Sequence, residues 1–140
     1  MVIETTHSNK AYKELVNDTL GKSFSLYKSF KIGGIGSKRM IVDEVSLKFK
    51  HLIDMVSDIN YANIELRPKG IIVHIDQGLK KYKWIIPYYQ LVIYKTNGLS
   101  IHSQGNFIHF KNNKSYQENK QFLDKLFELK IKNTINHSLN

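Results

Sequence analysis

The sequence contains no cysteine among its 140 residues, which excludes disulfide bonds and thiolate metal sites. No window approaches the roughly 20 consecutive apolar residues that a membrane-spanning helix needs. The first residues have neither the basic start nor the apolar run of a signal peptide. We therefore expect a cytoplasmic location.

Arginine is also scarce, since Arg39 and Arg67 are the only two, although the chain has 21 basic and 12 acidic residues and a net charge of +9. Residues 61–140 carry +7 of this charge. A basic half-chain favours anionic partners such as lipid headgroups, nucleic acid or acidic peptides. The lack of arginine argues against dedicated phosphate or base recognition, where bidentate arginine is preferred. A solvated, lysine-rich surface is the ordinary alternative.

The chain is rich in Ile, Val, Tyr and Phe between Tyr61 and Phe110, and turn residues interrupt this stretch at short intervals. The pattern predicts an antiparallel meander. Pro87 marks an edge, a bulge or the end of a strand, because proline cannot donate to a ladder. The six strands that we expect span residues 62–67, 70–76, 81–86, 89–95, 99–103 and 106–110.

The first hairpin has the clearest register. Pro68 and Gly70 suit the second and fourth positions of a tight turn, so Arg67 should pair with Gly70. A slip of one residue would move every apolar side chain to the other face. This register places six apolar or small residues on one core face: Ala62, Ile64, Leu66, Ile71, Val73 and Ile75.

Two further turns predict the second half of the meander. Asn97-Gly98 is a strong hairpin signal because both residues tolerate positive φ, and it would pair Thr96 with Leu99 and Tyr94 with Ile101. Gln104-Gly105 would pair Ser103 with Asn106, Ile101 with Ile108 and Leu99 with Phe110. In this register a second, partly apolar side is left to be covered, and we expect an interaction surface there at Leu91, Ile93 and Phe107.

The segments outside the meander are expected to be mainly helical. Helical spacing, a Ser8 cap and Gly21 predict a helix over residues 9–20. Residues 24–32 fit a strand or a helix, and we favour a strand. Residues 40–49 fit a strand and residues 51–58 a helical turn. Residues 33–39 are glycine-rich, but their order does not fit a phosphate-binding loop, so we expect a turn.

The last helix is predicted over residues 116–132. Ser115 and Glu118 have the spacing of a capping box, and Phe122, Leu123, Leu126, Phe127 and Leu129 form an apolar stripe. The polar residues 133–140 should be a disordered tail. The domain organisation that we expect is an N-terminal helical extension packed on the sheet (1–40), a folded domain (41–132) and the tail (133–140).

Two segments carry a resemblance to a known superfold. Residues 66–71 (Leu-Arg-Pro-Lys-Gly-Ile) and 86–91 (Ile-Pro-Tyr-Tyr-Gln-Leu) resemble the first hairpin and the entry to a middle strand of pleckstrin-homology domains, including bacterial and GRAM-type relatives. The resemblance implies an α+β fold, with an antiparallel meander of six to seven strands forming a split barrel plugged by the C-terminal helix. The first of seven strands would come from residues 40–49.

No catalytic motif is recognisable. His102 and His109 are diagonal neighbours in the predicted register, but zinc needs a third or fourth ligand and none lies nearby in sequence. We expect no metal, no cofactor and no enzymatic activity. The resemblance implies a binding module, and in its phosphoinositide-binding members basic residues near the first hairpins hold the headgroup. Five residues could do so here: Arg67, Lys69, Lys80, Lys81 and Lys83.

Three functions fit the sequence. The first is a soluble interaction module that binds a protein partner or a second copy through its sheet surface. The second is a peripheral module at the inner membrane that binds anionic lipid through the basic residues. Weak nucleic-acid binding comes third, because it would need exposed stacking aromatics and a steep salt dependence.

Overall fold

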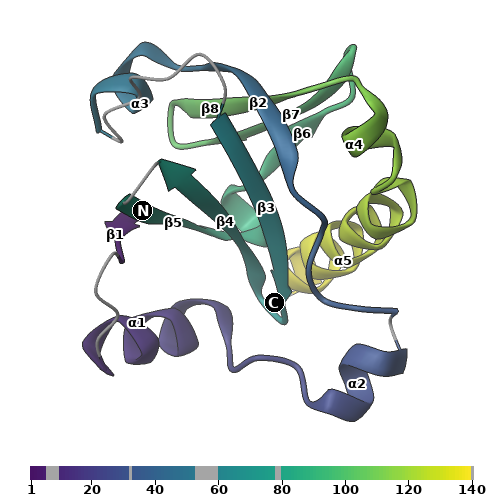
Figure 1. The fold of residues 1–140 in the computed structure, drawn as a ribbon. Helices are drawn as coiled ribbons and strands as arrows, with labels where there is room; N and C mark the ends of the chain where they lie inside the picture. The colour runs from purple at the N-terminus through teal and green to yellow at the C-terminus, as the bar shows by residue number, and fades with distance from the viewer. Residues whose placement is uncertain (6–9, 32, 53–59, 78–79, 140) are drawn as a thin grey trace.

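The computed structural model describes residues 1–5, 10–31, 33–52, 60–77 and 80–139. Within these residues the fold is α+β, with one antiparallel sheet of eight strands and five α-helices (Figure 1). The strands are β1 (Val2–Glu4), β2 (Met40–Val45), β3 (Asn60–Arg67), β4 (Gly70–Gln77), β5 (Lys80–Pro87), β6 (Val92–Tyr94), β7 (Gly98–Ser103) and β8 (Asn106–Lys111). The helices are α1 (Lys10–Leu20), α2 (Leu26–Lys31), α3 (Leu47–Leu52), α4 (Lys114–Gln117) and α5 (Lys120–Leu139), with a 3-10 turn η1 (Tyr88–Gln90).

The sheet has the strand order β1-β5-β4-β3-β2-β8-β7-β6 and is not closed, because β1 and β6 lie at its two ends. Strand β2 pairs with both β3 and β8. We call β1, β5, β4 and β3 the first half-sheet, and β8, β7 and β6 the second. The antiparallel sheet is thus confirmed, but it consists of two meanders, β2 to β5 and β6 to β8, which the pairing of β2 with β8 joins, rather than one continuous meander. The sheet has more than the six to seven predicted strands because β1, which pairs with β5, was not expected from the sequence.

The first hairpin has the predicted register, with Arg67 opposite Gly70 and Leu66 opposite Ile71. The six residues of its predicted core face are all buried. This face meets the inner face of the second half-sheet in one apolar core, which α3 and α5 complete (Figure 1). Phe49 of α3 contacts Trp84 of β5 edge to face, with 4.7 Å between ring centroids.

Helix α1 packs on the outer face of the first half-sheet. Val16 and Leu20 are buried against Ile72 and Ile85. The helix begins and ends close to the predicted limits, and Gly21 has a φ of +82°. The glycine ends the helix in the left-handed region, which residues with a side chain rarely adopt. The outward-facing Ile72 is thereby covered by the N-terminal segment.

The register between β6 and β7 differs from the prediction. Tyr94 lies opposite Ser100 and Ile93 opposite Ile101, a shift of one residue. Asn97 and Gly98 both have positive φ, at 47° and 113°, as expected. However, the connection between the strands is an odd number of residues, 95–97, so the faces are exchanged. The Gln104-Gly105 hairpin has the predicted pairing.

The secondary structure of three other segments also differs from the prediction. Residues 26–31 are helical rather than extended, because the Ser25 side chain accepts a hydrogen bond from the Lys28 amide and caps the turn. The strand expected at 89–95 begins as the turn η1 and becomes extended at Val92. Strand β2 ends at Val45 and α3 follows, so the strand expected over 40–49 is shorter. Part of the helical turn expected over 51–58 lies outside the described residues.

The glycine-rich loop is a turn followed by sheet-like pairing. Gly33 and Gly34 have positive φ. Beyond them the Leu66 amide donates to the Ile35 carbonyl, and the Ser37 amide donates to the Ile64 carbonyl. The second part of the loop therefore lies alongside β3 and pairs with it before β2 begins.

The C-terminal helix is divided and longer than predicted. Asn113, not Ser115, caps α4, since its side chain accepts a hydrogen bond from the Tyr116 amide. Ser115 lies inside α4, so the predicted capping box is not formed. Helix α5 continues to Leu139, so residues 133–139 are helical rather than a disordered tail. Leu123 and Leu126 of α5 are buried in the core, as the apolar stripe predicts.

Candidate functional site

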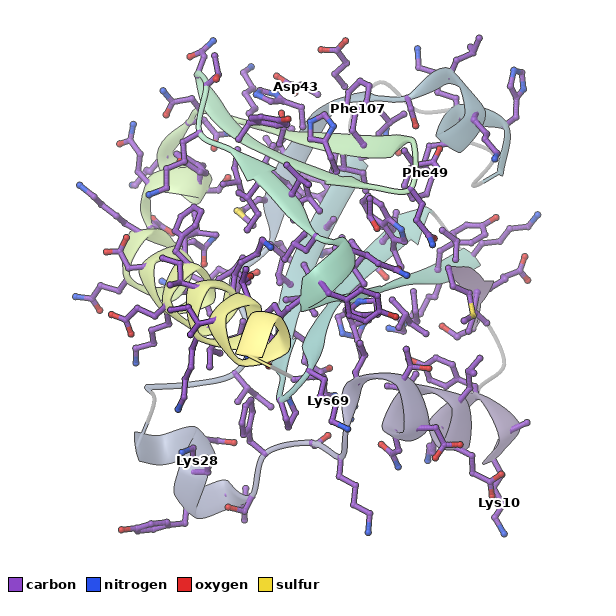
Figure 2. The ribbon with its side chains drawn as sticks, turned by 180° about the vertical axis from the view of Figure 1, so that it is seen from behind. Lys10, Lys28, Asp43, Phe49, Lys69 and Phe107 are labelled. Atoms are coloured by element: carbon purple, nitrogen blue, oxygen red, sulfur yellow. The ribbon has the colours of Figure 1, made fainter. Side chains whose placement is uncertain are left out.

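The five basic residues expected to form a binding cluster are not brought together. Strand β4 runs from Gly70 to Gln77, and its preceding and following turns lie at its opposite ends. Lys69 lies in the turn before Gly70 and Lys80 begins β5 opposite Gln77, so they are roughly 24 Å apart at the usual rise per strand residue. Figure 2 shows Lys69 near α1, far from Asp43 and Phe107. The five residues therefore do not form one patch, although Arg67 and Lys83 lie on the same face of the first half-sheet, with Glu65 and His74 between them.

Arg67 is held by the protein itself. Its Nε donates to Glu65 Oε2 at 2.6 Å, and its Nη1 donates to Asn17 Oδ1 and to the Gly21 carbonyl, both at 3.2 Å. These contacts fasten the end of α1 to the edge of the first hairpin. The Nε and Nη1 donors of the guanidinium are therefore engaged within the fold.

The three residues of the predicted interaction surface do not lie on one exposed face. Leu91 is buried in the core and Ile93 packs against it, because the shifted register turns Ile93 inward. Phe107 does lie on the outer face, where its ring stacks on His102 at 5.2 Å, and Tyr94 contacts His102 edge-on. Val92 and Tyr94, which the prediction placed inside, are exposed beside them.

The two histidines considered for a metal make separate contacts. His109 Nδ1 lies 2.6 Å from Asp43 Oδ1, and His102 lies between the rings of Tyr94 and Phe107. In the part of the chain that the structure describes, no group of three or more His, Asp or Glu side chains could hold a metal ion.

A cavity of about 470 Å³ lies between the end of β6 and the C-terminal helices. Leu123 and Phe127 of α5 and Tyr116 of α4 give it apolar walls. The remaining lining residues are polar or charged: Lys95, Gln117, Lys120 and Asp124. A volume in this range suits a small ligand or one large side chain of a partner.

Two lysines, Lys95 and Lys120, line the cavity. Lys95 follows β6 directly, and its Nζ lies 3.7 Å from the centroid of the Phe127 ring. This cation–π contact is worth about 0.5–1 kcal/mol at an exposed site, so an anionic group can compete for Lys95 at little cost. Lys120 adds a second positive charge and Asp124 a single negative one. The cavity therefore favours an apolar group with a nearby negative charge.

The edge of the sheet adjoins this cavity. Among the residues that the structure describes, β6 pairs with β7 and ends the sheet order, so none of the described strands uses its other edge. An unpaired edge presents a row of backbone donors and acceptors that can take an added strand. Because Lys95 both follows β6 and lines the cavity, the cavity lies next to the end of this strand.

Sequence reasoning missed this site. Tyr116, Leu123 and Phe127 were all expected on a core-facing helix, but only Leu123 is fully buried among them. The available signal was the width of the apolar stripe on α5. Phe122, Leu123, Leu126 and Phe127 cover more of the helix than one contact with the sheet can bury.

Comparison of the chain with protein families, with curated proteins and with solved structures gave no match. Among the helices that the structure describes, none is both long and apolar enough to cross a membrane.

Proposed function

We propose that the chain is a non-enzymatic interaction module of the pleckstrin-homology type that binds an extended, acidic segment of a partner protein. The observation that carries this proposal is the cavity lined by Leu123 and Phe127, which has Lys95 and Lys120 in its lining and lies next to the end of β6.

The architecture supports the resemblance to the superfold. Strands β2 to β5 and β6 to β8 make two meanders, seven strands in all, and β2 comes from residues 40–45, where the first strand was expected. The second meander is followed by α4 and α5, and Leu123 and Leu126 of α5 enter the core between the half-sheets. The N-terminal strand β1 and helices α1 and α2 are additions to this plan.

The binding mode follows from two adjacent features. A partner segment would pair its backbone with the outer edge of β6, which supplies a few hydrogen bonds of about 0.5–1.5 kcal/mol each. An apolar side chain placed in the cavity would add about 1.5–3 kcal/mol. Carboxylates flanking it would meet Lys95 and Lys120. The sum corresponds to micromolar or weaker binding, on the order of a transient interface.

The lipid alternative has less support. It required a cluster of Arg67, Lys69 and the three lysines of β5, but Lys69 and Lys80 lie beside opposite ends of β4. Vesicle co-sedimentation at low and high salt remains its test, since headgroup binding of this kind is salt-sensitive.

The proposal is tested by NMR titration of the isotope-labelled chain with short synthetic peptides. One peptide carries a central phenylalanine flanked by glutamates, a second has lysines in place of the glutamates, and a third has alanine in place of the phenylalanine. We expect only the first to shift the amide signals of Val92–Tyr94 together with those of Leu123 and Phe127. Lys95→Glu and Lys120→Glu should each weaken its binding by up to about fivefold.

The matched control is Lys48→Glu, which makes the same charge change at an exposed position of α3. It should leave peptide binding unchanged. The proposal is wrong if the acidic peptide shifts no cavity signals at about millimolar concentration, or if the lysine-flanked peptide binds equally well. Sedimentation of the chain alone would show whether a second copy occupies the same edge.

A further inference from the structure

A row of four polar side chains crosses the outer face of the first half-sheet, away from the cavity. Arg67 Nε donates to Glu65 Oε2 at 2.6 Å, and Glu65 Oε1 lies 3.0 Å from His74 Nε2. His74 Nδ1 is in turn hydrogen-bonded to Lys83 Nζ. We call Glu65, His74 and Lys83 the acid–imidazole–amine row.

Strand pairing fixes the order of this row. His74 of β4 and Lys83 of β5 are direct cross-strand partners, so their side chains share one face. His74 is opposite Asn63, and Glu65 is two residues further along β3 on the same face. The three groups are therefore positioned by backbone ladders rather than by loops, which keeps their relative geometry constant.

The hydrogen bonds set the protonation of the imidazole. Burial alone would raise the pKa of Glu65, but hydrogen bonds from His74 and Arg67 outweigh it, so the pKa is lowered and the carboxylate is ionised. A carboxylate only accepts, so His74 Nε2 carries the proton and Nδ1 keeps a lone pair. That lone pair faces Lys83 Nζ. An acid that orients an imidazole beside a nucleophile is the arrangement that activates side chains for attack.

The surroundings of Lys83 also favour its neutral form. Burial lowers the pKa of the Lys83 ammonium, and the charge of Lys81 lowers it further, while Asp76 and Glu65 act in the opposite direction. Its cross-strand partner on β1 is the apolar Ile3. Only a neutral amine is a nucleophile, so an amine that is half-buried and hydrogen-bonded to a base is more reactive than a solvated one.

We propose that Lys83 is a nucleophilic lysine that accepts an acyl group from an acyl phosphate or an acyl thioester. In the reaction the ammonium proton passes to His74 Nδ1, and the Nζ lone pair attacks the acyl carbonyl carbon. The bond from that carbon to the phosphate oxygen or the thiolate sulfur then breaks, and the leaving group takes its electron pair. The second proton on the attacking nitrogen is lost to water, and the His74 imidazolium gives its proton to the leaving thiolate or to water. The products are Nε-acyl-lysine and free phosphate or thiol, and His74 returns to its starting state.

Acylation would change the outer face of the half-sheet. The product has no positive charge at position 83 but retains one N–H that can donate to His74. The net charge of the surface around Glu65 and Asp76 would then become more negative. Because this face is distinct from the cavity at α5, the inference does not depend on peptide binding.

The test is competitive acylation of the full chain. The protein is treated briefly with limiting acetyl phosphate, and in a separate arm with an acetyl thioester, at neutral pH, and the initial rate at each lysine is measured by peptide mass spectrometry. We expect Lys83 to react at least about fivefold faster than the exposed Lys69 and Lys80 in at least one arm. The arm that shows the preference identifies the donor.

Substitution of the base separates this proposal from simple accessibility. His74→Asn should bring the rate at Lys83 down to that of the exposed lysines or below, whereas His102→Asn on the other half-sheet should leave it unchanged. Where circular dichroism shows that His74→Asn disturbs the fold, Glu65→Gln serves instead and should slow Lys83 in the same direction. The proposal is overturned if Lys83 reacts no faster than Lys69 in both arms, or if removing the imidazole from a folded variant leaves its rate unchanged.

Discussion

Asp43 Oδ1 lies 2.6 Å from His109 Nδ1, and the other ring nitrogen of His109 lies 3.3 Å from the Thr96 carbonyl oxygen. A bulge in β2 between Val42 and Glu44 aims the Asp43 side chain at the neighbouring strand. Both partners of the ring are acceptors, so only the doubly protonated imidazolium satisfies both contacts. The pair thus joins β2 and β8 to the connection between β6 and β7.

This geometry predicts a pH-dependent contribution to stability. Burial by itself would lower the pKa of His109, but the hydrogen bonds to Asp43 and Thr96 outweigh it and raise the pKa above its ordinary value of 6.5. The contribution is therefore complete below the ordinary value and is lost as the pH rises through the raised one. In urea melts of the native chain, we expect the contribution of the Asp43–His109 pair to the free energy of unfolding to disappear as the pH rises from about 6 to 8.

Variants isolate this contribution from other groups. Asp43→Asn should reduce the decline with pH, and Glu44→Gln, a neighbouring exposed acid on the same strand, should not. The comparison must be between variants because burial lowers the pKa of His102, which gives a contribution of the opposite sign. If the native chain and Asp43→Asn lose stability equally with pH, the pair contributes nothing measurable.

The turn glycines of the second half-sheet give a second prediction. Gly98 and Gly105 both have positive φ, at 113° and 82°. A Cβ on Gly98 would lie 2.2 Å from the Phe110 carbonyl oxygen, whereas a Cβ on Gly105 would have no heavy atom within 4 Å. Gly105→Ala should cost about 1–2 kcal/mol from backbone strain alone. Gly98→Ala should cost at least about 1 kcal/mol more, because the backbone must also move.

Chemical denaturation of the two alanine variants checks this difference. Equal losses would show that the close approach of Gly98 to β8 is relieved without cost, and that only φ matters at both positions. A loss larger at Gly105 than at Gly98 would contradict the geometry of the second half-sheet.

The first hairpin could be predicted because two independent signals agree. Pro68 and Gly70 fix the turn, and strict alternation of apolar residues fixes the faces, so a shifted register would expose the core. The β6–β7 pairing had no such agreement. Val92, Ile93 and Tyr94 are all apolar, so either face could be the inner one, and two positive-φ residues do not fix the length of a connection.

The candidate site could be predicted only in part. That Lys69 and Lys80 lie far apart follows from the sequence, because they flank a single strand and its ends must be separated. The cavity could not be found in this way. Lys95 and Phe127 are distant in the chain and meet only because α5 packs beside the end of β6, which local pattern does not specify.

The start of the C-terminal helices supplies a third prediction. Asn113 Oδ1 accepts hydrogen bonds from the Tyr116 amide and from the Ser115 hydroxyl. Asn113→Ala should therefore cost about 1 kcal/mol of stability, as for other N-caps. Glu118→Ala should cost less than about 0.5 kcal/mol, because the Glu118 side chain is exposed and its ion pair with Lys38 is long, at 3.9 Å. If urea melts show a larger loss for Glu118→Ala than for Asn113→Ala, the helix is instead capped by the predicted box of Ser115 and Glu118.

Helix α5 is predicted to be part of the folding core rather than an appendage. Leu126 is fully buried between the half-sheets, whereas Ile131 is 60% exposed one turn further along the same helix. Leu126→Ala removes the side chain from a closed apolar environment and should cost about 2–5 kcal/mol. Ile131→Ala deletes a similar aliphatic group on the solvent side and should change stability by less than about 0.5 kcal/mol. Urea melts of the two variants measure this difference, and a loss below about 1 kcal/mol for Leu126→Ala would mean that α5 does not close the core. In that case the cavity beside β6 would have no rigid wall, and the peptide-binding proposal would fail with it.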